Sequence, residues 1–250
     1  MYNQFIYQPI LQTLLWLYHA TGNLGVAIIV LTLLVRGILI PFTLPQLKSA
    51  KKMAALKPEL DALKKKHGAD PKVFQQKQLE FYKTHGVNPA AGCLPFIAQF
   101  IVLIALYQVF MHTLGGNGMG DIGSAFLLWD LKVKDTSFIL PILAGLLQLL
   151  TSLALLPAIE NKPSEREGTK EQKQDVAEMA QSMQQQMVFM MPIMTVIFSL
   201  QFPSGLALYW VITTAFSFAQ QLIVSGPGGL LVYARKIIKF KEKYATRRTK

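Results

Sequence analysis

The sequence predicts an all-α polytopic membrane protein, with five transmembrane helices around a hydrophilic groove open to the cytoplasm and a cytoplasmic helical hairpin. Three observations support this prediction. Hydrophobic residues make up 52% of the 250 residues and charged residues only 16%, which is a membrane composition. Long apolar stretches alternate with polar segments. The Lys and Arg residues gather on one side of these stretches.

Residues 1–23 are predicted to form an amphipathic helix that lies in the extracytoplasmic interface. Apolar residues recur there at helical spacing, and the segment contains no Lys or Arg. Gly22 and Asn23 would end this helix. The first ten residues lack the basic region of a standard signal peptide, so they are not expected to be one.

The first predicted span covers residues 24–45 and contains one arginine, Arg36. A central arginine costs about 2.5–3.5 kcal/mol, and the many Leu, Ile, Val and Phe residues around it contribute more than that, so the segment still inserts. No acidic residue lies in any other apolar stretch, so no ion-pair partner is expected in the membrane. We therefore expect Arg36 to face water or a polar cavity. A side chain that reaches back to the nearby interface is the alternative.

The polar members of this span share one helical line, which supports the cavity-facing interpretation: Gly25, Thr32, Arg36 and Thr43. Pro41 and Pro45 are expected to mark where the chain leaves the membrane.

Residues 46–92 are predicted to form a basic helical hairpin outside the bilayer. The segment holds ten lysines and four acidic residues. Asp70 and Pro71 form a good N-cap and first-turn pair for its second helix, after a turn at residues 67–69. A solvated lysine-rich loop without a partner is the alternative.

Four further spans are predicted after the hairpin, at residues 93–114, 138–156, 187–201 and 206–224. An extracytoplasmic loop at 115–137, a cytoplasmic loop at 157–186 and an extracytoplasmic turn at 202–205 connect them, and a basic tail at 225–250 follows. The span at 187–201 would be only about 23 Å long at the helical rise, which predicts local thinning of the bilayer.

The basic residues predict the orientation. Of the 25 Lys and Arg residues, 22 lie in residues 46–92, 157–186 and 233–250. Lys132 and Lys134 alone lie in the loops of the opposite side. Because basic loops are retained in the cytoplasm, the N-terminus is expected outside and the C-terminus inside.

The sequence lacks the residue patterns of an enzyme. The four histidines form no metal-binding pair, the single Cys93 excludes a cysteine cluster, and no carboxylate lies in a predicted span. No cofactor is expected. Three functions remain open: an insertase or chaperone with a one-sided groove, a channel or anion transporter that binds its ion through Arg36, and a structural scaffold. Apolar outer halves of the spans favour the groove.

Five sequence stretches then occur in a characteristic order between residue 24 and about residue 224: LTLLVRGILIPFT, YKTHGVNPAAGCLPFIAQF, FILPILAG, MMPIM, and FPSGLALYW followed by AQQ. They strongly resemble the YidC/Oxa/Alb family of membrane protein insertases. The resemblance implies the short five-span form of the bacterial plasma membrane, without a large extracytoplasmic domain.

The resemblance also implies a client groove and an adjacent slide for apolar client helices. Arg36 and Thr32 match groove positions of the first core helix, and Gln99 matches one of the second. Ser152 stands where the family often has a glutamine, and we expect Gln148, one turn earlier, to replace it. The expected groove residues are Arg36, Thr32, Gln99, Gln148, Ser152, Thr213 and Ser217. The expected slide residues are Tyr209, Trp210 and Phe100, the last in place of the family's usual methionine.

The partners implied by the resemblance are nascent membrane proteins, the Sec translocon, the signal-recognition targeting machinery and membrane lipids. The basic tail would contact ribosomal RNA through a cluster of cationic side chains: Arg235, Lys236, Lys239, Arg247 and Arg248. A plain positive-inside anchor explains the same tail equally well.

Overall fold

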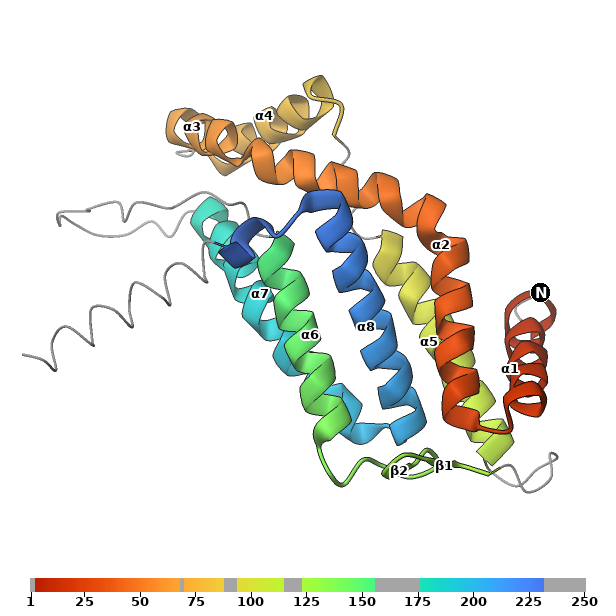
Figure 1. The fold of residues 1–250 in the computed structure, drawn as a ribbon. Helices are drawn as coiled ribbons and strands as arrows, with labels where there is room; N and C mark the ends of the chain where they lie inside the picture. Colours follow the sequence, from red (N-terminus) through yellow and green to blue (C-terminus); the bar gives the residue numbers. More distant parts are fainter. Residues whose placement is uncertain (1–2, 68–69, 88–93, 115–122, 156–175, 232–250) are drawn as a thin grey trace, which may run out of the picture.

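The computed structural model describes residues 3–67, 70–87, 94–114, 123–155 and 176–231. It is mostly helical (Figure 1). After a π-helical turn at Asn3–Tyr7, the helices are α1 (Gln8–Thr21), α2 (Leu24–Ala55), α3 (Lys57–His67), α4 (Pro71–Thr84), α5 (Leu94–Leu114), α6 (Ile139–Leu155), α7 (Val176–Gln201) and α8 (Ser204–Ser225). Two short strands, β1 (Ala125–Phe126) and β2 (Trp129–Asp130), pair antiparallel. This β-hairpin is a departure from the predicted all-α fold.

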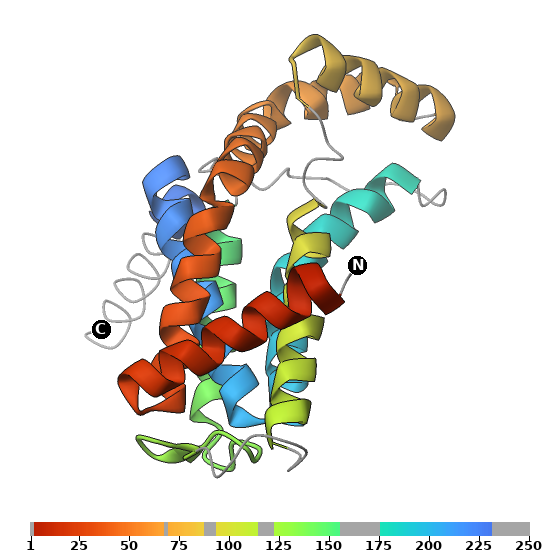
Figure 2. The same ribbon diagram turned by 90° about the vertical axis from the view of Figure 1, so that its right-hand side faces the viewer.

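Helix α8 lies at the centre of the bundle. It packs against α2 on one side and α6 on the other, and α7 packs against α6 (Figure 1). Helix α1 packs against α2 and α5 and crosses them obliquely (Figure 2). Small residues lie inside the bundle: Ala27 of α2, Ala144 of α6 and Ala207 of α8 are completely buried. Small side chains let helix backbones approach closely. In a bilayer, where lipid tails are as apolar as the side chains, such close packing is what holds helices together.

Gly205 shows how close this packing is. A β-carbon placed there would collide with the ring of Phe110 on α5 and lie 3.2 Å from the carbonyl oxygen of Leu131. The backbone N–H of Gly205 donates to that same carbonyl at 3.1 Å. The first turn of α8 is therefore fixed between α5 and the segment after β2.

We expect Gly205→Ala to lower the free energy of unfolding by about 1–3 kcal/mol, the usual effect of overpacking a filled contact. The measurement is the thermal unfolding midpoint of the purified chain in detergent. Gly37→Ala is the matched control, because a β-carbon at Gly37 would meet nothing within 4 Å and alanine favours a helix. Equal midpoints for the two variants would contradict the close contact.

Pro41 and Pro45 were predicted to mark where the chain leaves the membrane. Neither proline ends the helix, because α2 continues through both to Ala55. Helix α2 bends along its length, and its later part crosses the end of α8 (Figure 1). Prolines inside a helix commonly cause such bends. Two contacts hold the later part in place: Gln220 Nε2 donates to Thr43 Oγ1 at 2.8 Å, and Lys51 Nζ donates to the Val224 carbonyl at 3.1 Å.

Helices α3 and α4 form a pair that projects from one end of the bundle (Figures 1 and 2). Asp70 caps α4, as its position before Pro71 predicts: its Oδ1 accepts from the backbone N–H groups of Lys72 and Val73 at 2.9 and 3.2 Å. His85 on the α4 side lies 3.7 Å from the carboxylate of Glu59 on α3. The side of the membrane on which this pair lies stays a prediction.

At the opposite end of the bundle, residues 124–138 fix the starts of α6 and α8. The backbone N–H of Ser204 donates to the Val133 carbonyl at 2.8 Å. Asp135 Oδ2 accepts from the backbone N–H of Leu140 at 2.8 Å, and its Oδ1 accepts from the N–H of Ser137 at 2.8 Å. Burial alone would raise the pKa of Asp135, but these hydrogen bonds outweigh it and hold that pKa below its ordinary value. The carboxylate thus stays charged and caps α6.

Candidate functional site

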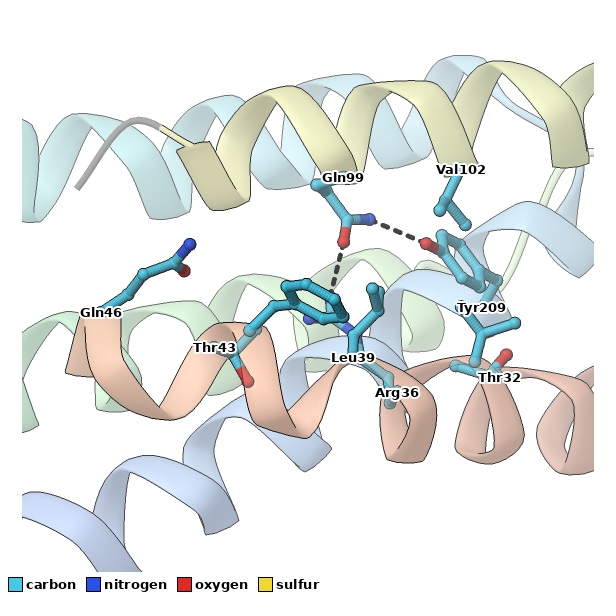
Figure 3. Close-up of a pocket in the computed structure, with 10 residues that line it drawn as sticks. Thr32, Arg36, Leu39, Thr43, Gln46, Gln99, Val102 and Tyr209 are labelled. Carbon is cyan, nitrogen blue, oxygen red and sulfur yellow. Dashed lines mark hydrogen bonds between the residues drawn. The ribbon is translucent and has the colours of Figure 1, made fainter. Parts of the chain in front are cut away.

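A cavity of about 260 Å³ lies between α2, α5 and α8. Its polar lining comes from all three helices: Thr32, Arg36, Thr43 and Gln46 of α2, Gln99 of α5 and Tyr209 of α8 (Figure 3). Val35, Leu39, Phe42 and Val102 supply the apolar lining. Thr32 and Gln46 are 14 residues apart in one helix, so the lining extends about 21 Å along α2 toward the α3–α4 pair.

One hydrogen-bonded chain crosses the cavity and joins the three helices. The Arg36 guanidinium donates to Gln99 Oε1 at 2.5 Å, and Gln99 Nε2 donates to the Tyr209 hydroxyl at 2.9 Å (Figure 3). Arg36 therefore meets a neutral amide. Within the described part of the chain, no carboxylate forms a salt bridge with it.

This arrangement leaves the positive charge of Arg36 uncompensated by a counter-ion. A guanidinium carries five N–H donors in a planar fork that fits a carboxylate. A neutral acceptor orients the fork without cancelling its charge. The cavity can thus attract an acidic group, whereas the described residues contain no cluster of side chains suited to a metal ion.

The polar groups at the two ends of the lining differ in how they are satisfied. The hydroxyl of Thr32 donates to the Ile28 carbonyl of its own helix at 2.6 Å, so it is satisfied without a ligand. Gln46 Oε1 is buried and has no hydrogen-bond partner among the described groups. Sequence reasoning missed Gln46, because it follows Pro45 and was assigned to the hairpin. Its position one turn after Thr43 was the available signal.

Four residues predicted for the groove do not line this cavity: Gln148, Ser152, Thr213 and Ser217. The first two are half-buried on α6, which packs on the side of α8 away from α2. Thr213 is buried, and the hydroxyl of Ser217 donates to the Thr213 carbonyl at 2.9 Å. A groove role for these residues stays a prediction.

The three predicted slide residues face different surroundings. Tyr209 is only 2% exposed and its hydroxyl belongs to the hydrogen-bonded chain, whereas Trp210 is half-buried and Phe100 is 46% exposed. Their slide role stays a prediction. The tail residues Arg235, Lys236, Lys239, Arg247 and Arg248 lie outside the described residues.

The model of the 60Kd inner membrane protein family matches residues 16–227. The chain belongs to this family. Membrane protein insertase MisCA of Bacillus subtilis (strain 168) is 33% identical over 231 residues, which cover 90% of this chain and 80% of that protein. Membrane protein insertase YidC of Aeromonas hydrophila is 40% identical over 224 residues, which cover 88% of this chain and 36% of that protein.

A crystal structure of an active YidC insertase, with its first transmembrane domain resolved, has a TM-score of 0.62 to this chain. The two are 26% identical, and the match covers 88% of this chain and 46% of that one. The predicted resemblance to the YidC/Oxa/Alb family is therefore confirmed. The 60Kd inner membrane protein family consists of membrane protein insertases and is not a class of enzymes, and its members support an insertase function for the chain.

Proposed function

We propose that the chain takes hydrophilic segments of client proteins into the Arg36 cavity and releases their apolar helices into the bilayer. The observation that carries this proposal is the pairing of Arg36 with the neutral Gln99, at 2.5 Å, in a cavity lined by other polar groups. An uncompensated cation on a membrane helix lowers the cost of bringing an acidic client segment to that depth. Polar groups at the α3–α4 end, Thr43 and Gln46, support entry from that side.

We infer five spans with the N-terminus outside and the C-terminus in the cytoplasm. Two described helices, α2 and α8, are long and apolar enough to cross a membrane. Shorter apolar helical segments lie at Gln99–Met111, Ile139–Ala154 and Phe189–Gln201. The short apolar stretch that ends α7 at Gln201 would go with a locally thinned bilayer, which would shorten the apolar path of a client.

Release into lipid would follow the outer face of α5. Phe100 and Ile104 are 46% and 48% exposed there, next to Gln99 of the cavity. A client could thus keep its polar segment at Arg36 while its apolar helix contacts lipid beside α5. The lysine-rich α3–α4 pair would receive clients, the Sec translocon or the signal-recognition machinery, and the basic tail would contact the ribosome.

The proposal is tested with purified full-length chain in liposomes of defined lipids. A client with one apolar helix and a short acidic N-terminal tail is added, and the tail is scored by protection from external protease. We expect protected tail in these liposomes and none in liposomes without the chain. Equal protection in both would overturn the proposal.

The channel alternative uses the same Arg36 charge and predicts a different result. A channel or anion transporter would pass ions across a planar bilayer that contains the chain alone. We expect no such conductance. Conductance that disappears in Arg36→Ala, without any client insertion, would establish the alternative.

A further inference from the structure

A second cavity, of about 510 Å³, lies at the end of the bundle opposite the α3–α4 pair. Tyr107 and Met111 of α5 form one wall, Gln201 and Phe202 at the end of α7 form another, and the segment after β2 contributes Lys132 and Lys134. The cavity is thus separate from the Arg36 cavity, since no described residue lines both.

The cavity walls are held by backbone contacts. Lys134 forms an isolated β-bridge with Pro203, and Ser204 N–H donates to the Val133 carbonyl at 2.8 Å. The rings of Tyr107 and Phe202 meet edge to face, with centroids 5.8 Å apart. The backbone that carries the two lysines is therefore held beside an aromatic pair at the end of the helices.

The charges around the cavity favour an anion inside it. Among the described residues, Lys132 and Lys134 line it and no carboxylate does. Two acids of the described segment lie close by: Asp135 caps α6, and Asp130 accepts from the Lys132 N–H at 3.0 Å. Hydrogen bonds from Ser124 and from that N–H, and to a smaller extent the charge of Lys132, hold the pKa of Asp130 below its usual range, so this carboxylate offsets part of the positive charge and leaves Lys134 as the freer cation. Neither lysine forms a salt bridge within the described ranges.

Apolar side chains continue from the cavity along two membrane helices. Ile104, Tyr107 and Met111 follow one face of α5 at helical spacing, and they are 48%, 39% and 53% exposed. Met194 and Phe198 on α7 are also exposed and lie about two turns and one turn before Gln201, respectively. A cationic and aromatic cavity that leads into apolar helix faces matches an amphiphile with a phosphate at one end and acyl chains at the other. The tip of the adjacent β-hairpin supports a position of this cavity beside lipid, because the apolar side chains of Leu127 and Leu128 are each 82% exposed.

We propose that this cavity binds the headgroup of an anionic phospholipid, with its phosphate between Lys132 and Lys134 and its acyl chains along α5 and α7. This site goes beyond the insertase function, since it does not involve Arg36. In the proposed orientation the lipid belongs to the outer leaflet. An acidic client segment that emerges on this side would use the same lysines, but it would not need the apolar helix faces.

The test is native mass spectrometry of the purified full-length chain in detergent, titrated with phosphatidylglycerol. The variant carries Lys132→Gln and Lys134→Gln together, and the charge-matched control carries Lys72→Gln and Lys83→Gln, two exposed lysines of α4. A lost charge-assisted hydrogen bond weakens binding about tenfold. We therefore expect the strongest bound lipid to be retained by the wild type and the control, and to bind at least about tenfold more weakly to the double variant.

Two further arms keep the result unambiguous. Lys132→Arg with Lys134→Arg should retain the lipid, because the charge is kept, and a far-ultraviolet circular dichroism spectrum checks that the glutamine variant is folded. Equal lipid retention by the glutamine variant, or equal loss in the α4 control, would overturn the proposal. Displacement of the lipid by an acidic peptide at a lower concentration than the lipid itself would assign the cavity to an emerging client instead.

Discussion

Arg36→Ala is expected to reduce the insertion rate of a client with an acidic N-terminal tail by about 10- to 100-fold. The reason is the loss of charge-assisted hydrogen bonds to the tail carboxylate, each of which contributes about 1.5–3 kcal/mol. The described residues offer no second cation in the cavity to replace it. The measurement is the initial rate of tail protection in liposomes that contain equal amounts of each variant.

Two controls separate charge from structure in this experiment. Arg36→Lys keeps the charge but loses the planar fork, so we expect partial recovery. A client with an uncharged tail should insert at nearly the same rate in the wild type and in Arg36→Ala. Arg36→Ala also leaves Gln99 Oε1 without its donor, so a fall in the free energy of unfolding of about 1–3 kcal/mol is expected for this variant, and the normal rate with the uncharged tail shows that the lost stability is not what slows the acidic client. A wild-type rate for Arg36→Ala with the acidic client would contradict a direct role for Arg36.

Much of the fold could be predicted from the sequence, because long apolar periodic stretches and a strong cap such as Asp70 are local signals. The path of α2 beyond Pro45 could not. Two prolines near a change from apolar to lysine-rich sequence suggest an end, and only the contacts of Thr43 and Lys51 with α8 show why the helix continues. The β1–β2 hairpin was also missed, since its Leu127–Leu128 turn lacks the usual glycine or asparagine although Leu127 has a φ of 53°.

The candidate site was predictable only in part. A lone arginine in an apolar stretch is rare and usually functional, so Arg36 could be selected as a site residue from the sequence. Its hydrogen-bond partner could not, because Gln99 is 63 positions away and a neutral amide carries no charge that would match it to an arginine. Periodicity shows which residues share a face but not which helix that face meets. Gln148 and Ser152 were grouped with Arg36 on such a pattern; α6, which carries them, packs mainly against α7 and α8 and has few contacts with α2, and their groove role stays a prediction.

Replacement of Gln99 is expected to lower both the stability of the bundle and the rate of client insertion. Gln99→Leu keeps the approximate volume of the side chain but removes the link between α2, α5 and α8. Arg36 and the Tyr209 hydroxyl then lose their shared partner, and leaving such groups unsatisfied costs about 1–3 kcal/mol each. We expect a lower thermal unfolding midpoint and an insertion rate reduced about tenfold or more, because Arg36 is no longer oriented into the cavity.

Comparison with two other variants identifies the source of this effect. Tyr209→Phe removes only the hydroxyl that accepts from Gln99, so its effect should be smaller, about 1 kcal/mol in stability. Gln148→Leu is the matched control: it makes the same chemical change on a half-buried position of α6 that does not line the cavity. If Arg36 acts from the cavity between α2, α5 and α8, insertion depends on Gln99 and not on Gln148. A strong defect in Gln148→Leu together with normal insertion by Gln99→Leu would move the client groove to the α6 side of α8.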